Sequence, residues 1–187
     1  MAVRQQEGLD AAAVHDMLQR QGRLAVTVAA DGERILPHHI YIGGSDDMMT
    51  LEDGHIRIRA ASEPVGHRGT VDTMLISLAE HAQERAIAVI LKGLENDGTA
   101  GVAATKKFGG LSIAEIGESE EGSAEEGLGA SAIADLRLPA QGIATHIALY
   151  AGNVTEEEDI GLEDEPPSGL EAQITQIATV LSQCHQP

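Results

Sequence analysis

Aromatic residues, cysteine and positive charge are all scarce in this chain of 187 residues. Tryptophan is absent and aromatics make up 2% of the sequence, which argues against aromatic platforms for stacking bases. The single cysteine, Cys184, excludes an intrachain disulfide framework and a thiolate zinc site. Lysine and arginine number 12 against 30 aspartates and glutamates, a formal net charge of -18. Such a surface repels phosphate backbones, so we expect no nucleic-acid partner.

Long apolar runs are also missing. No stretch approaches the roughly 20 apolar residues of a membrane-spanning helix, and the N-terminus lacks the apolar run of a signal peptide. We therefore expect no membrane span and a cytoplasmic protein. What the chain does have is 42% hydrophobic residues, so its core must be built from alanine, valine, isoleucine, leucine and methionine.

Hydrophobic periodicity alternates between helical and extended patterns along the chain. Apolar residues at helical spacing predict helices over 9–18, 70–82 with Thr70 as N-cap, 99–108, 130–134 and 143–150. Extended patterns predict strands over 24–28, 39–42 and 111–116, and a hairpin of 48–51 and 55–59 around Asp53-Gly54. The run 86–91 has no polar alternation, which favours a central parallel strand buried on both faces. The order predicts an α/β fold, a Rossmann-like and mostly parallel sheet flanked by helices, with a β-hairpin.

Composition divides the chain into three parts. Residues 1–150 hold the alternating elements and form the expected domain. Residues 151–168 are rich in glutamate and aspartate and contain Pro166-Pro167, which predicts an acidic linker. Residues 169–187 place apolar side chains at helical spacing, which predicts a C-terminal amphipathic helix.

The loop 92–98 is the strongest candidate site. It follows the strand 86–91, and ligands of open parallel sheets gather at the carboxyl ends of strands. Asp97, between Asn96 and Gly98, can be held there by backbone amides. Local reasoning favours a simpler role, in which Asp97 caps the helix 99–108.

Four segments occur in a fixed order: DGERILP at 31–37, HIYI at 39–42, HRGTVD at 67–72 and VILKGLENDGTAG at 89–101. From about residue 18 to about residue 149 the chain resembles, in register, the catalytic domain of CheB-type protein-glutamate methylesterases. That family writes these stretches roughly as DGE-x-L-x-P-GHxYIAP, R-x-SVD and VLTGMGxDGAxG.

The resemblance implies a chemistry and a set of partners. The family hydrolyses methyl esters on chemoreceptor glutamates with a Ser, His, Asp triad. Asp97 stands at the position of the triad aspartate, and Gly93, Leu94, Asn96 and Gly98 form the substrate loop. The implied partner is a methyl-accepting chemoreceptor or another signalling protein. The acidic segment and the helix after it resemble the junction of CheB–CheR hybrids, so a CheR-type methyltransferase domain or a receiver domain is a further candidate partner.

Departures from the family pattern concern the other triad members. Only 30 residues precede Asp31, which leaves no room for the strand and loop of the family serine, and the family histidine falls near Gln5 and Gln6. Glu95 adds a charge to the substrate loop. We therefore expect a CheB-like domain without the serine- and histidine-bearing N-terminal strands, impaired in catalysis and acting by binding or regulation.

Two alternatives stay open. One is an active methylesterase or deamidase with a rearranged triad, using a serine such as Ser45 and a loop histidine. The other is a self-associating module, in effect a homo-oligomer, because an unpaired sheet edge invites pairing.

Metal and cofactor sites are not predicted. Histidines 38, 39, 55 and 67 with aspartates 46, 47 and 53 lack a second pair at ligand spacing. His15, in the middle of a helical pattern, is expected at the surface or its boundary rather than as a substitute base. The glycine pattern at 127–132 follows an acidic run instead of a strand, so dinucleotide binding is unsupported.

Overall fold

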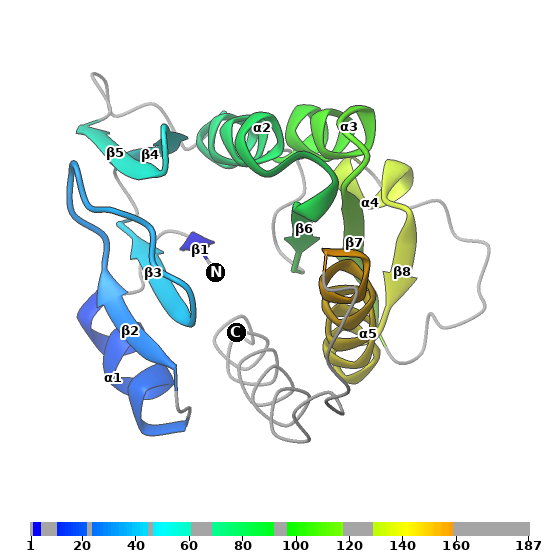
Figure 1. Ribbon diagram of the computed structural model, residues 1–187, viewed down its shortest axis with the longest axis horizontal. Helices are drawn as coiled ribbons and strands as arrows, with labels where there is room; N and C mark the ends of the chain where they lie inside the picture. The colour runs from blue at the N-terminus through cyan, green and yellow to red at the C-terminus, as the bar shows by residue number, and fades with distance from the viewer. Residues whose placement is uncertain are drawn as a thin grey trace.

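A computed structural model describes residues 2–4, 11–21, 24–44, 47–60, 69–91, 97–117 and 129–158 (Figure 1). Its helices are α1 (Ala11–Gln21), α2 (Thr70–Ala82), the 3-10 turn η1 (Gln83–Arg85), α3 (Thr99–Lys107), α4 (Ala130–Ile133) and α5 (Ala140–Glu158). Its strands are β1 (Ala2–Arg4), β2 (Ala25–Val28), β3 (His39–Gly43), β4 (Asp47–Glu52), β5 (His55–Ala60), β6 (Ile87–Ile90), β7 (Leu111–Glu115) and β8 (Leu136–Leu138).

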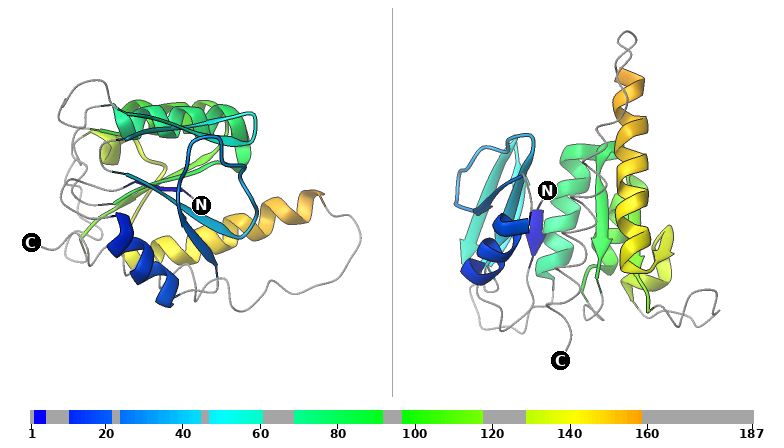
Figure 2. Two further views of the ribbon diagram at one scale, coloured as in Figure 1. Left: turned by 90° about the vertical axis from the view of Figure 1, so that its left-hand side faces the viewer. Right: turned by 90° about the horizontal axis from the view of Figure 1, so that it is seen from below.

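The elements form three layers, in which the two parallel sheets lie between two layers of helices and the hairpin of β4 and β5 lies beside α2. Helices α2 and α3 lie on one side of the strands, and α1 and α5 lie on the other (Figure 2). The strands form two parallel sheets, ordered β1-β3-β2 and β6-β7-β8, and one antiparallel pair, β4-β5. The α/β fold class predicted from the sequence is therefore confirmed.

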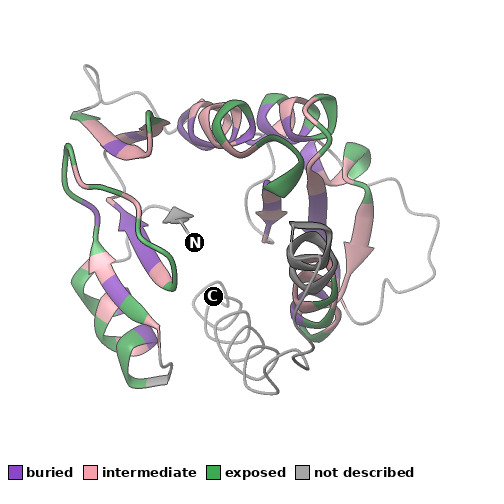
Figure 3. Cartoon of the chain, in the orientation of Figure 1, coloured by how far each residue is buried: buried purple, intermediate pink, exposed green. Residues whose placement is uncertain are grey.

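Strand β3 shows how alternation places residues in different cores. Ile40 and Ile42 are buried with Val14 and Leu18 of α1, because successive side chains of a strand point to opposite faces. Tyr41 points to the other face and belongs to the core that contains α2 and α3 residues. Figure 3 shows the buried positions along both parallel sheets and along these helices.

The hairpin of β4 and β5 follows the predicted turn. Asp53 and Gly54 have φ of 48 and 75°, the pair of positive values that suits a two-residue hairpin turn. The hairpin buries Met49 and Ile56 in the same core as α2. The Leu51 N–H donates to the Ser77 hydroxyl of α2 at 3.1 Å, which joins the hairpin to the helix layer.

Strand β6 departs from the sequence prediction in its position. The strand itself is confirmed, and Ala88 and Ile90 are 0% and 3% exposed. Within the described part of the chain, however, β6 is an edge strand that pairs with β7 alone. Ile87 and Val89 are accordingly half-buried rather than buried.

Helix α5 is longer than the pattern predicts. It begins at Ala140 and ends at Glu158, so its last turns include the first residues of the segment expected to be a linker. The remainder of that segment and the predicted helix 169–187 lie outside the described residues. Within the described ranges, no helix has the length and apolar character needed to cross a bilayer.

Candidate functional site

The Asp97 carboxylate lies at the junction of two helix N-termini. It is 9% exposed. One oxygen, Oδ2, accepts hydrogen bonds from the Val71 N–H at 3.0 Å and the Thr70 hydroxyl at 3.4 Å. The other, Oδ1, accepts from the Asp72 N–H at 3.0 Å and the Gly98 N–H at 2.9 Å. Four donors from the chain therefore surround this one carboxylate.

This contact pattern makes Asp97 the cap of α2. Helix α2 begins at Thr70, so Val71 and Asp72 are its second and third residues, whose N–H groups have no partner within the helix. An N-cap side chain normally satisfies these groups from the preceding position. Here Gly69 occupies that position and makes no side-chain bond, and Asp97 supplies the carboxylate from a distant part of the chain.

Helix α3 receives the reciprocal contact. The Gly101 N–H, in the first turn of α3, donates to Asp72 Oδ1 at 2.8 Å. The predicted local role of Asp97 as cap of α3 is wrong, because Gly98 is the N-cap residue of α3 and the carboxylate that accepts from its first turn is that of Asp72. Asp97, which precedes α3, therefore caps α2, and Asp72 of α2 caps α3. The N-terminus of each helix faces a negative charge, which is the favourable orientation for the helix dipole.

Two glycines allow this close approach. Gly98 has φ of +98°, and a Cβ there would lie 2.9 Å from Ile90 Cδ1. At Gly101 a Cβ would lie 2.4 Å from the Leu75 Cβ of α2. A side chain at Gly101 would push α3 away from Leu75 of α2, while a side chain at Gly98 would press on Ile90 of β6 and would have to adopt a positive φ.

The chemistry open to Asp97 follows from its hydrogen bonds. An ionised carboxylate has about four lone-pair sites, and the four donors above match that number. A triad aspartate must accept a proton-bearing ring nitrogen from its histidine. Within the described ranges, no histidine nitrogen or serine hydroxyl is hydrogen-bonded to Asp97. The described part of the site is therefore an anchored carboxylate without a nucleophile or base beside it.

The structure describes part of the predicted site. Gly98 lies next to the Asp97 carboxylate, as expected for a residue of the same loop. Gly93, Leu94 and Asn96, together with Ser45, fall outside the described residues. Asp72 was given no role by sequence reasoning, although it ends the HRGTVD segment that carries part of the family resemblance. That segment is the signal that could have identified it.

His15 and His39 make contacts near their own elements and not with Asp97. His15 on α1 lies 3.1 Å from the Val26 carbonyl through Nε2 and 3.2 Å from Asp16 through Nδ1. His39 Nδ1 lies 3.0 Å from the Pro37 carbonyl, and its ring stacks on Tyr41. Among the described residues, no group of three or more histidine, cysteine, aspartate or glutamate side chains could hold a metal ion.

A second polar cluster joins α3, β7 and the turn before β8. Asp135 accepts hydrogen bonds from the Ser112 hydroxyl at 2.5 Å and the Ser112 N–H at 3.0 Å, and pairs with Lys106 Nζ at 2.9 Å. Burial alone would raise the pKa of Asp135, but the hydrogen bonds from Ser112 and Lys106 outweigh it and hold the pKa below 3.8. Ser112 is 0% exposed, so this cluster is a structural clamp.

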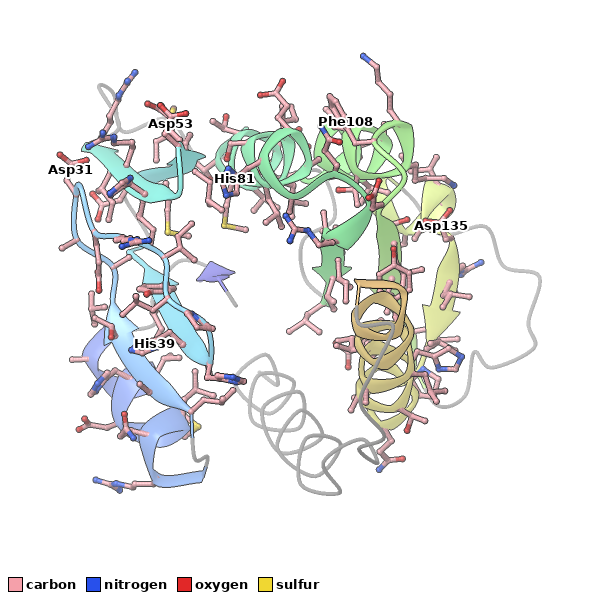
Figure 4. All side chains as sticks on the ribbon, viewed as in Figure 1. Asp31, His39, Asp53, His81, Phe108 and Asp135 are labelled. Carbon is pink, nitrogen blue, oxygen red and sulfur yellow. The ribbon has the colours of Figure 1, made fainter. Side chains whose placement is uncertain are left out.

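The two carboxylate clusters occupy different parts of the molecule. Figure 4 places Asp135 beside α4 and β8, on the side opposite the labelled Asp31 and Asp53 of the hairpin end. The Asp97 carboxylate lies apart from Asp135, because its hydrogen-bond donors come from the first turn of α2. Its position at the α2–α3 junction agrees with the predicted edge of the sheet, at the carboxyl end of β6.

Comparison with known proteins supplies an independent line of argument. Residues 4–147 match the CheB methylesterase family. The chain is 38% identical over 104 residues to the protein-glutamate methylesterase/protein-glutamine glutaminase of Salmonella typhimurium, a match covering 54% of this chain and 30% of that protein. It is 45% identical over 98 residues to the same-named protein of Bordetella pertussis, covering 49% of this chain and 28% of that one. The matches thus span about a third of each relative.

A solved structure matches over a larger share. The CheB methylesterase catalytic domain of Thermotoga maritima superposes with a TM-score of 0.62 at 29% sequence identity. The superposition covers 78% of this chain and 80% of that domain. The shared architecture therefore extends over most of the described elements.

Proposed function

Because the chain belongs to the CheB methylesterase family, we propose that it is a receptor-binding domain of bacterial chemotaxis signalling that is impaired in ester hydrolysis. The family membership supports the chemotaxis setting, and the names of the relatives supply the substrate class, a protein glutamate ester. A cytoplasmic location is part of the proposal, since chemoreceptor glutamates are the expected target.

The observation that carries the impairment is the state of the Asp97 carboxylate. Its four acceptor sites are filled by Thr70, Val71, Asp72 and Gly98. In the family mechanism the aspartate orients a histidine, which in turn activates a serine. A carboxylate that already accepts four hydrogen bonds from the chain is a weaker and more crowded acceptor for that histidine.

Charge supports the same proposal. The formal net charge of -18 repels unmethylated receptor glutamates, whereas methyl esterification removes the charge of those glutamates. We infer that binding favours the methylated, less acidic form of a receptor, because fewer like charges then approach the domain. In this role the domain would regulate signalling by occupying the methylated sites of the receptor.

The test is a comparison of binding with turnover. The full chain is incubated with a chemoreceptor cytoplasmic fragment carrying labelled methyl esters, and methanol release is recorded together with co-sedimentation of the complex. We expect binding without methanol release above the buffer rate. The Salmonella typhimurium methylesterase serves as the positive control for release.

Release of methanol that depends on Asp97 would overturn the impairment and favour an active enzyme with a rearranged triad. Absence of binding to both methylated and unmethylated receptor would overturn the receptor-binding role. A CheR-type or receiver domain as partner stays a prediction from the sequence, because residues 159–187 lie outside the described part.

A further inference from the structure

Three Asp-Gly pairs occur in the chain: Asp31-Gly32, Asp53-Gly54 and Asp97-Gly98. In such a pair the backbone nitrogen of glycine can attack the side-chain carboxyl carbon of aspartate and close a succinimide ring, because glycine has no Cβ to hinder the approach. All three glycines have positive φ, 77, 75 and 98°, so φ does not distinguish the pairs. Their hydrogen bonds do, since the attack needs a free glycine nitrogen and a free carboxyl group.

The Asp97-Gly98 pair is fully engaged. The Gly98 N–H donates to Asp97 Oδ1 at 2.9 Å. The same carboxylate accepts three further hydrogen bonds from the first turn of α2. Asp97 is also buried, which leaves little access for the water that opens a succinimide ring. We expect no reaction at this pair in the folded chain.

The Asp31-Gly32 pair is held by the hairpin strand β5. The Gly32 N–H donates to the Ile56 carbonyl at 2.8 Å, and Asp31 Oδ1 accepts from the Ile58 N–H at 3.0 Å. Both reacting groups are therefore engaged, although Asp31 itself is exposed. Breaking these two hydrogen bonds before the attack slows ring closure about tenfold or more.

The Asp53-Gly54 pair forms the turn between β4 and β5 (Figure 4). Asp53 is exposed. Among the described residues, its carboxylate accepts no hydrogen bond and the Gly54 N–H donates none. A Cβ built on Gly54 would have nothing within 4 Å, so the space beside the glycine is open. Both reacting groups are free at this pair.

A neighbouring histidine acts on the peptide group that joins the two residues. His55 Nδ1 lies 2.9 Å from the Asp53 carbonyl oxygen. A carbonyl oxygen only accepts hydrogen bonds, so Nδ1 is the donor in this contact. A hydrogen bond to the carbonyl polarises the peptide group and makes the Gly54 N–H easier to deprotonate, which favours attack by the nitrogen.

We propose that Asp53-Gly54 is a site of spontaneous isoaspartate formation, and that the resulting carboxylate is a substrate for a protein carboxyl methyltransferase. The Gly54 nitrogen bonds to Asp53 Cγ and loses its proton, while a C–O bond of the protonated carboxyl group breaks and its oxygen leaves as water. One water then opens the ring. Opening at the Cγ–N bond restores aspartate, whereas opening at the bond to the backbone carbonyl carbon leaves the chain running through Cγ and frees the α-carboxylate.

The two steps balance without a redox partner, and the isoaspartyl chain has the mass of the original. The methyltransferase then moves a methyl group from S-adenosylmethionine to the freed α-carboxylate and releases S-adenosylhomocysteine. Isoaspartate also adds one methylene to the backbone of a turn whose strands pair Glu52 with His55. The Gly54 carbonyl accepts from the Ile35 N–H at 2.9 Å, so the longer backbone disturbs this contact and the packing of the hairpin on α2.

The test compares the three pairs within one chain. The folded full chain is incubated at physiological temperature and neutral pH and digested with trypsin, which separates the pairs into peptides 24–34, 35–57 and 93–106. Isoaspartate is located by fragmentation in the mass spectrometer. We expect peptide 35–57 to contain about tenfold more isoaspartate, or a larger excess, than either other peptide. In urea the three rates should agree within about threefold.

A second measurement tests the enzyme substrate. The incubated chain, still folded, is treated with a protein-isoaspartate methyltransferase and labelled S-adenosylmethionine. We expect label to be incorporated in proportion to the isoaspartate of peptide 35–57. Asp53→Glu is the control, because its longer side chain closes the ring far more slowly, and it should lower incorporation about tenfold or more.

Matched variants locate the effect in the structure. Asp53→Asn and Asp31→Asn each place asparagine before glycine, which closes the same ring with loss of ammonia instead of water. We expect Asp53→Asn to deamidate about tenfold or more faster than Asp31→Asn in the folded chain, and at the same rate within about threefold in urea. Circular dichroism of fresh samples checks folding, and the wild-type peptides decide the matter if Asp31→Asn does not fold.

Four results would overturn the proposal. Three concern the folded chain: no isoaspartate in peptide 35–57, equal amounts in all three peptides, or equal deamidation of the two asparagine variants. The fourth is isoaspartate at Asp53 that the methyltransferase leaves unlabelled, because the freed carboxylate would then be no substrate.

Discussion

Replacing Asp97 with asparagine separates a capping role from a catalytic one. The substitution keeps the shape of the side chain, but it removes the charge and turns one acceptor into an NH₂ group. That group must face two of the four donors, either Thr70 and Val71 or Asp72 and Gly98. Hydrogen bonds to charged groups contribute about 1.5–3 kcal/mol each, and a lost N-cap costs about 1 kcal/mol.

With Asp97 9% exposed, solvent replaces these bonds poorly. We expect Asp97→Asn to lower the free energy of unfolding by about 3 kcal/mol, which corresponds to a fall in Tm of about 6–12 °C for a chain of this size. The assay is urea denaturation followed by circular dichroism, with differential scanning calorimetry for Tm.

Asp53→Asn is the matched control. Asp53 is exposed at the hairpin turn with φ of 48°, a conformation that asparagine tolerates. We expect the free energy of unfolding to change by less than about 0.5 kcal/mol. If Asp97→Asn is as stable as Asp53→Asn, the Asp97 carboxylate does not hold the first turn of α2.

Two further predictions concern other contacts of the same layers. Gly101→Ala should destabilise the fold by about 1–3 kcal/mol, since its Cβ would lie 2.4 Å from the Leu75 Cβ. Gly142→Ala is the control, because the atom nearest to its Cβ is 3.5 Å away. Thermal unfolding of both variants checks this prediction, and equal Tm values would contradict it. The lowered pKa of Asp135 means that its contribution to stability is complete above the unfolded pKa and is lost as pH falls through the lower folded pKa. The difference in unfolding free energy between wild type and Asp135→Asn should therefore shrink below about pH 4, and a difference constant from pH 6 to pH 2.5 would count against the clamp.

Turn residues and hydrophobic periodicity predicted many of the elements, because these patterns determine the conformation of the few residues that carry them. Asp53-Gly54 specified the hairpin turn, whose positive φ values the structure shows. The unbroken apolar run before the site loop specified a parallel strand. Its position at the edge of the described part of its sheet could not be predicted, because edge or centre depends on which strands pair and not on the composition of one strand.

The capping of α2 at the candidate site could not be predicted from the sequence. The sequence pattern offered Thr70 as a local N-cap for α2 and Asp97 as a local N-cap for α3. In the structure Gly69 and Gly98 hold those positions, and the carboxylates come from the partner helix region. Capping rules describe neighbours in sequence, so an exchange between residues 25 positions apart leaves no local pattern.

The intact mass of the full chain after treatment with a serine-directed fluorophosphonate reports directly whether Asp97 supports a catalytic serine. Because Asp97 lies in a structural cap, no serine is activated through it, and we predict an unmodified mass under conditions that label the Salmonella typhimurium methylesterase. A single adduct on the wild-type chain that disappears in Asp97→Asn, with the variant still folded, would show that Asp97 activates a serine nucleophile.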